Sequence, residues 1–288
     1  MSNSSLLNNI KKLRELTGVG FKDCKIALED SNGDIEKSIE YLRKKGIAKA
    51  SKKMSRTASE GLVLIKEDKG SISLIEINSE TDFVAKNDDF IKFCKELSEI
   101  NFISKGNIEN INNSKMKNGF TVKDSLVNLI AKIGEKITIR RTKFFDNAKG
   151  KNFFYVHSSI DKYIGKIISI VKIDGLDDNK NLDLGTKIAM HITASNPLAI
   201  DKDNIDKKLI DKELEIIQAE VSNSGKPAEM VDKISKGKIE KFLNENSLLN
   251  QIWIMDPKKK VSDILDENSS EKKIKILEFV KYKVGEGI

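Results

Sequence analysis

A strand-like run hands over to an amphipathic helix at Thr81-Asp82-Phe83-Val84-Ala85-Lys86-Asn87. The run before it covers residues 71–78, and after it apolar residues recur at helical spacing, at Phe90, Phe93, Cys94, Leu97 and Ile100. Thr81 or Asp82 has the side chain to cap that helix, and on local grounds Phe83 is interpreted as a core residue at the turn. Strands followed by helices in this manner predict an α+β fold.

The sequence around this turn predicts the first half of a core, residues 60–146. Its other expected elements are a strand over residues 61–66 that forms a hairpin with residues 71–78, a helix over residues 124–133 and a strand over residues 136–141. Gly134 can terminate the helix. Residues 101–118 are rich in Asn and predict a loop.

The second half, residues 147–288, repeats this order of elements. We expect strands over residues 152–157 and 163–173, a helix through Leu184, Ile188, His191 and Ile192, and a strand over residues 274–284. Residues 206–242 interrupt the order with two charged helical patterns around a short polar turn, which predicts an inserted antiparallel helical hairpin. No sequence period relates the halves, so their relation rests on element order alone.

Residues 1–46 predict a small module of three helices. Apolar residues mark them at Leu6, Ile10 and Leu13, at Phe21, Cys24, Ala27 and Leu28, and at Ile35, Ile39 and Leu42. Gly18 and Gly33 separate the helices, Asp34 can cap the third, and Gly46 stands where that helix is expected to end.

Charge and hydropathy limit the classes of partner. The 51 basic and 44 acidic residues leave a net charge of +7, but the two signs are mixed along the chain, so direct nucleic-acid binding is not expected. Residues 47–59 are basic, lack an apolar stripe and are interpreted as a linker. No apolar run is long enough to cross a bilayer and the first residues lack signal-peptide features, so we expect a cytoplasmic protein without membrane binding.

Catalytic and metal sites are not expected. Cys24 and Cys94 are the only cysteines and His157 and His191 the only histidines, which is too few for a disulfide framework or a metal knuckle. Gly18-Val19-Gly20 has neither the preceding strand nor the following Gly-Lys-Ser of a phosphate loop. No Ser or Cys is spaced beside a candidate base. We therefore expect no enzyme, no cofactor and no direct nucleotide binding.

Two long motifs resemble the signatures of the elongation factor Ts family. The first reads Leu13-Arg14-Glu15-Leu16-Thr17-Gly18-Val19-Gly20-Phe21-Lys22-Asp23-Cys24-Lys25, followed by Ala27-Leu28 and Asn32-Gly33-Asp34. The second reads Glu76-Ile77-Asn78-Ser79-Glu80-Thr81-Asp82-Phe83-Val84-Ala85-Lys86-Asn87. Shorter matches are Ile133-Gly134-Glu135, Ile188-Ala189-Met190-His191, Ser224-Gly225-Lys226-Pro227 and Val284-Gly285-Glu286-Gly287. Ile26 departs from the usual polar residue, and residues 101–118 match poorly.

The resemblance implies both a fold and a partner. It implies a three-helix module similar to ubiquitin-associated domains, a two-part α+β core with an inserted helical hairpin, and a guanine nucleotide exchange factor for elongation factor Tu without bond-making chemistry. The module around Phe21 is expected to dock on the partner's nucleotide domain, the Asp82-Phe83 turn to reach its magnesium and phosphate site, and the region of His191 to hold its far domain. The partner-binding residues expected on this basis are Leu13, Val19, Gly20, Phe21, Thr81, Asp82, Phe83, Val84 and His191.

Two other functions fit parts of the sequence. A three-helix module can recognise ubiquitin-like or nascent-chain partners, but this explains only residues 1–46. A basic RNA-binding protein fits the charge, yet aromatic residues make up only 6% and no stacking motif interrupts a basic run. Retention on RNA with a steep salt dependence is the behaviour that favours this alternative.

Overall fold

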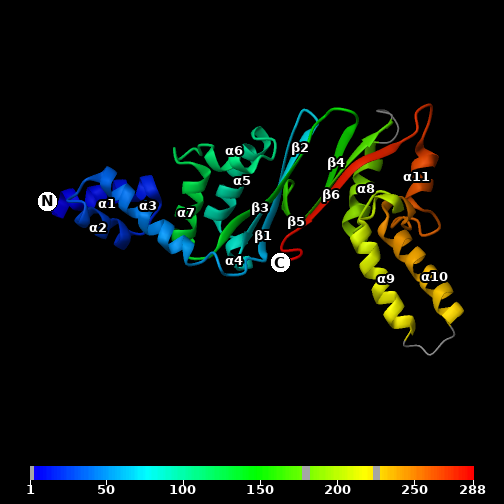
Figure 1. Cartoon of the computed structure of the whole chain (residues 1–288). Helices are drawn as coiled ribbons and strands as arrows, with labels where there is room; N and C mark the ends of the chain where they lie inside the picture. Colours follow the sequence, from blue (N-terminus) through cyan, green and yellow to red (C-terminus); the bar gives the residue numbers. More distant parts are fainter. Residues whose placement is uncertain (1–2, 177–181, 223–227) are drawn as a thin grey trace. The chain divides into compact units, whose positions relative to one another are not determined.

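The computed structural model describes residues 3–176, 182–222 and 228–288 (Figure 1). The chain divides into two compact units. Unit 1 holds residues 1–146, 158–167 and 282–288, and unit 2 holds residues 147–157 and 168–281. Helices and antiparallel strands occur together, which confirms the α+β fold class.

Three helices begin unit 1: α1 (Asn3–Thr17), α2 (Phe21–Asp30) and α3 (Ile35–Ser51). They enclose a small apolar cluster of Ile10, Leu13, Cys24, Ala27, Leu28 and Leu42. Asp34 caps α3 as predicted, because its side chain accepts a hydrogen bond of 3.0 Å from the Lys37 N–H.

Helix α3 continues beyond the expected end at Gly46. A Cβ atom at Gly46 would lie 3.3 Å from the Cγ1 atom of Val127 in α7 (Val122–Ile133), so the glycine allows α3 and α7 to approach closely. Ala50, four residues further along α3, is buried in the main core of unit 1. The first part of the segment predicted to be a linker is therefore helical and packed.

The sheet begins with a hairpin of β1 (Glu60–Asp68) and β2 (Ser71–Ser79). Lys69 and Gly70 join the strands with φ angles of 46° and 78°, which is the left-handed pair that a two-residue hairpin turn requires. Strand β3 (Ile137–Phe145) pairs antiparallel with β2, and β5 (Ile164–Asp174) pairs antiparallel with β1.

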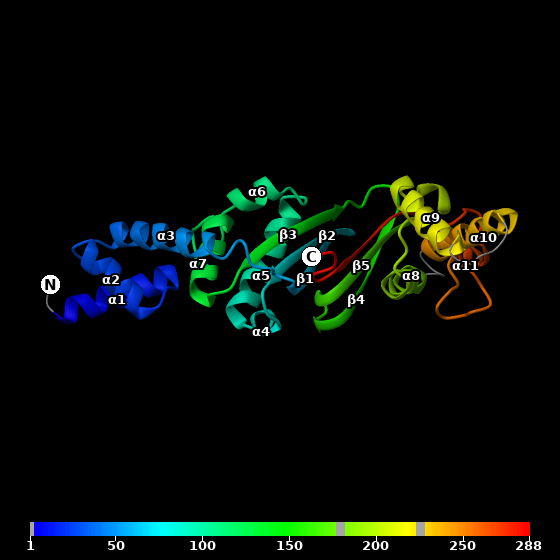
Figure 2. The ribbon, with the colours of Figure 1, turned by 60° about the horizontal axis from the view of Figure 1, so that its bottom comes forward.

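Within the described residues six strands form one sheet in the order β3-β2-β1-β5-β4, and β6 also pairs with β5. The added strands are β4 (Lys151–Asp161) and β6 (Lys275–Lys283). Helix α5 (Asp88–Ile103) lies across β1 and β2 in unit 1, and the short helix α4 (Asp82–Ala85) lies beside them (Figure 2).

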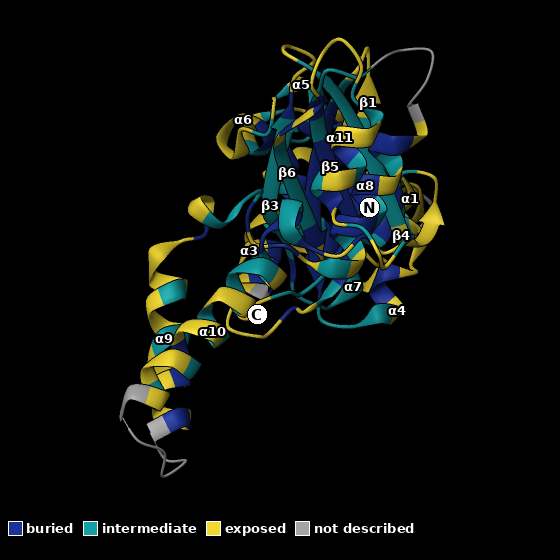
Figure 3. Ribbon diagram, turned by 90° about the vertical axis from the view of Figure 1, so that its right-hand side faces the viewer, coloured by how far each residue is buried: buried dark blue, intermediate teal, exposed yellow. Residues whose placement is uncertain are grey.

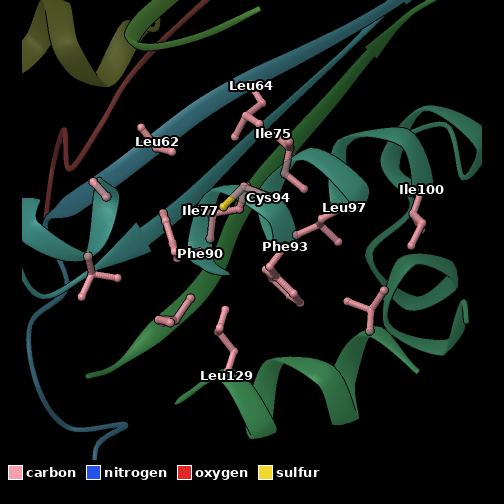
Figure 4. Close-up of a cluster of buried hydrophobic side chains, with 14 of the residues drawn as sticks. Leu62, Leu64, Ile75, Ile77, Phe90, Phe93, Cys94, Leu97, Ile100 and Leu129 are labelled. Atoms are coloured by element: carbon pink, nitrogen blue, oxygen red, sulfur yellow. The ribbon is translucent and has the colours of Figure 1, made fainter. Parts of the chain in front are cut away.

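Helix α5 supplies much of the core of unit 1 (Figure 4). Side chains from one face of α5 meet the strands of the hairpin and α7, and the labelled members are Leu62, Leu64, Ile75, Ile77, Phe90, Phe93, Cys94, Leu97, Ile100 and Leu129. Each large apolar side chain buried in this way contributes about 1.5–3 kcal/mol of transfer free energy. The apolar spacing read from the sequence is confirmed as the buried face of α5.

The Asn-rich segment is not the continuous loop that its composition predicted. Helix α5 extends to Ile103, and a further helix, α6 (Ile108–Asn113), follows. Asn107 caps α6 by accepting a hydrogen bond of 2.9 Å from the Asn110 N–H, and Ile111 is fully buried. One capping Asn and one anchoring Ile outweigh the loop preference of the other residues.

Unit 2 contains strand segments, helix α8 (Leu182–Ser195) and further helical elements. These are the 3-10 turns η1 (Lys202–Asn204) and η2 (Leu248–Asn250), the helices α9 (Lys207–Ser222) and α10 (Ala228–Asn246), and α11 (Val261–Asn268), which the sequence analysis did not predict. Helices α9 and α10 pack against each other and carry exposed residues along much of their length (Figure 3). The matched motif over residues 224–227 lies outside the described residues.

Candidate partner-binding site

The stretch after β2 forms a separate four-residue helix, α4. Asn87, and not Thr81 or Asp82, caps α5, because the Asn87 side chain accepts hydrogen bonds from the N–H groups of Asp89 and Phe90 at 3.0 and 3.3 Å. The capping role expected of Thr81 or Asp82 for that helix is therefore wrong. Strand β2 is therefore not followed directly by α5, because the short helix α4 lies between them in the sequence.

Helix α4 buries one side and exposes the other. Val84 and Ala85 are only 6% and 1% exposed and belong to the core of unit 1, whereas Phe83 is 79% exposed. The interpretation of Phe83 as a core residue is excluded. A phenyl ring held in solvent on a packed helix gains nothing for the fold of the monomer, and aromatic side chains of this kind are typical anchors of protein interfaces.

Asp82 carries a charge beside this ring. Its carboxylate accepts a hydrogen bond of 2.8 Å from the Lys86 Nζ atom, one turn away, and both side chains are well exposed. The hydrogen bond and the charge of Lys86 lower the pKa of the Asp82 carboxyl below its ordinary value. Asp82 is therefore ionised at neutral pH, with a partner that solvent or another protein can displace.

Thr81 is held by a residue from another element. Its N–H donates to the Oε2 atom of Glu135 at 3.0 Å, and its hydroxyl donates to the Oε1 atom of the same carboxylate at 2.8 Å. Glu135 stands between α7 and β3. In the sequence, Glu135 appeared only within the short family match Ile133-Gly134-Glu135. That match assigned no role to Glu135, so the sequence analysis missed its contact with Thr81.

Glu76 is a fully buried carboxylate on β2, the strand that leads to α4. It accepts hydrogen bonds from the side chains of Asn78, Arg140 and Arg141 and from the Gly285 N–H. Burial alone raises the pKa of the Glu76 carboxyl, but these hydrogen bonds together outweigh burial and leave the pKa below its ordinary value. A buried, ionised Glu76 thus joins β2 to β3 and to the segment around Gly285 in unit 1.

The expected N-terminal contacts divide into exposed and buried residues. Phe21 is 47% exposed at the start of α2, and Gly20 before it is also exposed. Leu13 is fully buried in the three-helix cluster, against which the half-buried Val19 packs. Leu13 therefore supports the exposed residues and offers no surface of its own.

His191 is fully buried on α8 in unit 2. Gln251 donates from Nε2 to the carbonyl oxygens of Ser195 and Glu245, so its Oε1 atom accepts the hydrogen bond of 2.9 Å that joins it to His191 Nε2. His191 Nδ1 then accepts a bond of 3.4 Å from the Ile254 N–H. Burial lowers the pKa of His191, and the ring is neutral.

The neutral His191 ring contacts and orders the segment of residues 251–255, which has exposed apolar side chains. Its ring stacks on Trp253 with centroids 5.2 Å apart, and its hydrogen bonds reach Gln251 and Ile254 on either side. The neighbouring Ile252, Ile254 and Met255 are 53%, 44% and 45% exposed. His191 itself cannot contact a partner in this conformation, but it holds residues that can, and the sequence analysis had not singled those residues out.

Two further observations concern the residues that the structure describes. None of their helices combines the length and apolar character needed to cross a membrane. No group of three or more His, Cys, Asp or Glu side chains among them is arranged to hold a metal ion.

Comparisons with known proteins cover nearly the whole chain. A family model described as Elongation factor TS matches residues 80–286, a range that includes α4 and His191. The Elongation factor Ts of Methylobacterium sp. (strain 4-46) is 40% identical over 283 residues, 97% of this chain and 92% of the relative. That of Clostridium botulinum (strain Eklund 17B / Type B) is 40% identical over 286 residues, 97% of this chain and 93% of the relative. By the family model and by these relatives, the chain belongs to the elongation factor Ts family.

Proposed function

We propose that this protein is a guanine nucleotide exchange factor that binds elongation factor Tu carrying GDP and promotes GDP release, as a translation factor of the cytoplasm. The observation that carries the proposal is the 79% exposed ring of Phe83 on a short helix whose Val84 and Ala85 are buried in the core of unit 1. Family membership supports the choice of partner. The proposed action requires no bond-making chemistry from this chain.

The mechanism is thermodynamic linkage between two ligands of one partner. If this protein binds more tightly to elongation factor Tu without GDP and magnesium, then GDP and magnesium must bind less tightly in its presence, by the same factor. Such coupling requires two states of the partner that differ at both sites. In this proposal α4 selects the state in which the nucleotide is held weakly.

The two exposed residues of α4 have different roles in this proposal. Phe83 acts as an apolar wedge that holds partner side chains apart next to the magnesium site. Asp82 acts on the water and ligand network around the ion, because magnesium demands near-ideal octahedral coordination by oxygen and retains several waters. Lys86, the present partner of Asp82, is exposed and can release the carboxylate on binding.

Two other surfaces are proposed to provide affinity. One is the start of α2, where Phe21 is exposed, and it is proposed to dock on the nucleotide domain of the partner. The other is the segment ordered by His191 in unit 2, proposed to contact the partner's far domain. The buried Leu13, Val84 and His191 contribute to these surfaces by positioning their exposed neighbours.

The test is the rate of labelled GDP release from elongation factor Tu in a stopped-flow instrument. Phe83→Ala is expected to slow release on the order of tenfold or more, because truncating an interfacial aromatic commonly costs over 1 kcal/mol and ~1.4 kcal/mol is tenfold. Asp82→Ala is expected to have a smaller effect that varies with magnesium concentration. Melting temperatures should change little, since the Phe83 ring is mostly exposed.

Ile103→Ala provides a matched control. Ile103 is 80% exposed at the end of α5, so its truncation removes a similarly exposed apolar side chain away from α4. It should release GDP at the wild-type rate. A normal rate per folded molecule for Phe83→Ala, together with a large drop in its melting temperature, contradicts the wedge.

A further inference from the structure

Two turns of unit 1 are joined at the start of α4 by hydrogen bonds to carboxylates, one carboxylate from each turn. The first joins β2 to α4 and contains Glu80 and Thr81, and the second joins α7 to β3 and contains Glu135 and Lys136. Glu135 receives the N–H and the hydroxyl of Thr81, while the Oε1 atom of Glu80 receives the Lys136 N–H at 2.6 Å. Each turn thus supplies the acceptor for a backbone donor of the other.

A third segment is attached to the same two turns. The Arg56 guanidinium donates to both carboxylate oxygens of Glu80 at 3.1 and 3.3 Å, and the Lys136 Nζ atom donates to the Arg56 carbonyl oxygen at 2.8 Å. Lys53 Nζ donates to the Gly134 carbonyl oxygen. The connection between α3 and β1 is therefore tied to the base of α4 by side chains from both turns.

The carboxylate of Glu80 is suited to this position. Its side chain is only 18% exposed, and partial burial by itself raises the pKa of the carboxyl. Hydrogen bonds from the Lys136 N–H and from Arg56 outweigh that effect and leave the Glu80 pKa below its ordinary value. Glu80 is therefore ionised at neutral pH, and charge-assisted hydrogen bonds of this kind are stronger than neutral ones.

Helix α4 needs such external support. It has only four residues, and isolated helices far longer than this are marginal in water. The Thr81 side chain stands at the N-cap position of α4 but accepts no capping hydrogen bond, and its hydroxyl donates to Glu135 instead. The orientation of α4 therefore depends on Glu135 at one side and on buried Val84 and Ala85 at the other.

We propose that Glu135, assisted by Glu80, is a positioning residue that holds α4 so that Phe83 faces the partner in one fixed orientation. This inference rests on the proposed function of Phe83 as a wedge. Pre-ordering of an anchor reduces the entropy lost on binding. The same contacts couple α4 to the segment that leads from the three N-terminal helices into the core.

The first experiment measures GDP release from elongation factor Tu at increasing concentrations of each variant. Glu135→Ala is expected to lower the maximal release rate on the order of tenfold, because a misplaced wedge loses most of the benefit of orientation. Its half-saturating concentration should change less, since the other docking surfaces remain. Glu135→Gln should retain most of the rate, because the amide can accept from the Thr81 N–H and donate to the Thr81 hydroxyl oxygen.

Two controls separate positioning from general stability. Glu99→Ala removes a carboxylate whose ion pair with Lys66 lies on the surface of unit 1, and it should behave as wild type. In the double variant Phe83→Ala with Glu135→Ala, the second change should add no further loss, because Glu135 acts through Phe83. Additive losses would show that Glu135 acts by another route.

The outcomes distinguish this inference from the function on which it rests. If the wild-type protein does not accelerate GDP release, the proposed function fails. If wild type is active and Glu135→Ala has the wild-type maximal rate, the positioning role of Glu135 alone is overturned. Should Glu135→Ala not fold, Glu135→Leu removes both acceptor oxygens while it keeps a side chain of similar size, and a wild-type maximal rate for that variant overturns the inference equally.

Discussion

At the scale of single residues, Glu76 shows how a buried charge is stabilised. The carboxylate has no exposed surface, but Arg140, Arg141, Asn78 and the Gly285 N–H all donate to it. Removing one partner from such a buried network leaves the others without their counter-charge. We expect Glu76→Gln to lower the free energy of unfolding by about 3 kcal/mol at neutral pH, measured by urea denaturation.

The effect of Glu76 should depend on pH with a definite sign. The folded-state pKa of Glu76 lies below its ordinary value of 4.5, so its stabilising contribution is fully present above pH 4.5. That contribution is lost as the pH falls through the lowered folded-state pKa. The difference in free energy of unfolding between wild type and Glu76→Gln should therefore become smaller at acid pH. Glu99→Gln, at an exposed ion pair, should show little difference at any pH.

His191 should make stability depend on pH in a higher range. Its folded-state pKa lies below the ordinary value of 6.5, so the neutral ring stabilises the fold above pH 6.5 and this contribution is lost as the pH falls below that value. Melting temperatures at pH 7.5 and 5.5 test this. His191→Gln should lack this part of the pH dependence, whereas variants of the exposed His157 should retain it. Equal pH dependence in wild type and His191→Gln would contradict the assignment.

At the scale of elements, the pair α9 and α10 packs largely upon itself. Ile217, Val221 and Ser235 are buried in these helices, while much of the remaining surface of both is exposed (Figure 3). We expect that replacing residues 206–242 with a short Gly/Ser linker leaves the rest of unit 2 folded. Circular dichroism and a cooperative melting transition are the measurements, and an aggregated product would show that the helices complete the core.

A slightly longer excision provides the matched variant. The carbonyl oxygen of Glu245 accepts a hydrogen bond from Gln251, and that of Asn246 accepts one from the Leu198 N–H. An excision that also removes residues 243–246 therefore removes a contact that orients Gln251, the hydrogen-bond partner of His191. This second variant should be clearly less stable than the first. Equal stability of the two would mean that these carbonyl contacts contribute little to unit 2.

At the scale of the whole molecule, the three N-terminal helices have their own apolar cluster, separate from the main core of unit 1. Deleting residues 1–46 should weaken binding to elongation factor Tu more than tenfold, because it removes the surface around Phe21 and its support. The remaining core should stay folded, since Ala50 and Ala58 are retained. Calorimetric titration and thermal melting measure the two effects.

The position of the cut supplies the control. Deleting residues 1–59 also removes Ala50, Ala58 and Arg56, of which the first two are buried and the third binds Glu80. The longer deletion should therefore lower the melting temperature as well as the affinity. Undiminished binding and exchange by the shorter deletion would contradict the docking role proposed for Phe21.

The sequence by itself determined the features that depend on neighbours along the chain. Asp34 caps α3, Gly134 ends α7 with a left-handed φ of 87°, and Lys69-Gly70 forms the hairpin turn. Each of these is settled by hydrogen bonds and sterics within a few residues. The buried face of α5 follows from apolar spacing for the same reason. The prediction of a loop over the Asn-rich residues 101–118 was wrong because composition does not reveal that Asn107 caps a helix.

Only the tertiary structure decided how distant residues complete the candidate site. Glu135 meets Thr81 across 54 residues, His191 meets Gln251 across 60, and Glu76 meets Gly285 across 209. Local periodicity carries no information on such pairs, because they are set by the pairing of strands and the packing of helices. The exposure of Phe83 belongs to the same class. Its orientation depends on which side of α4 the core covers, and local sequence preferences favoured the opposite answer.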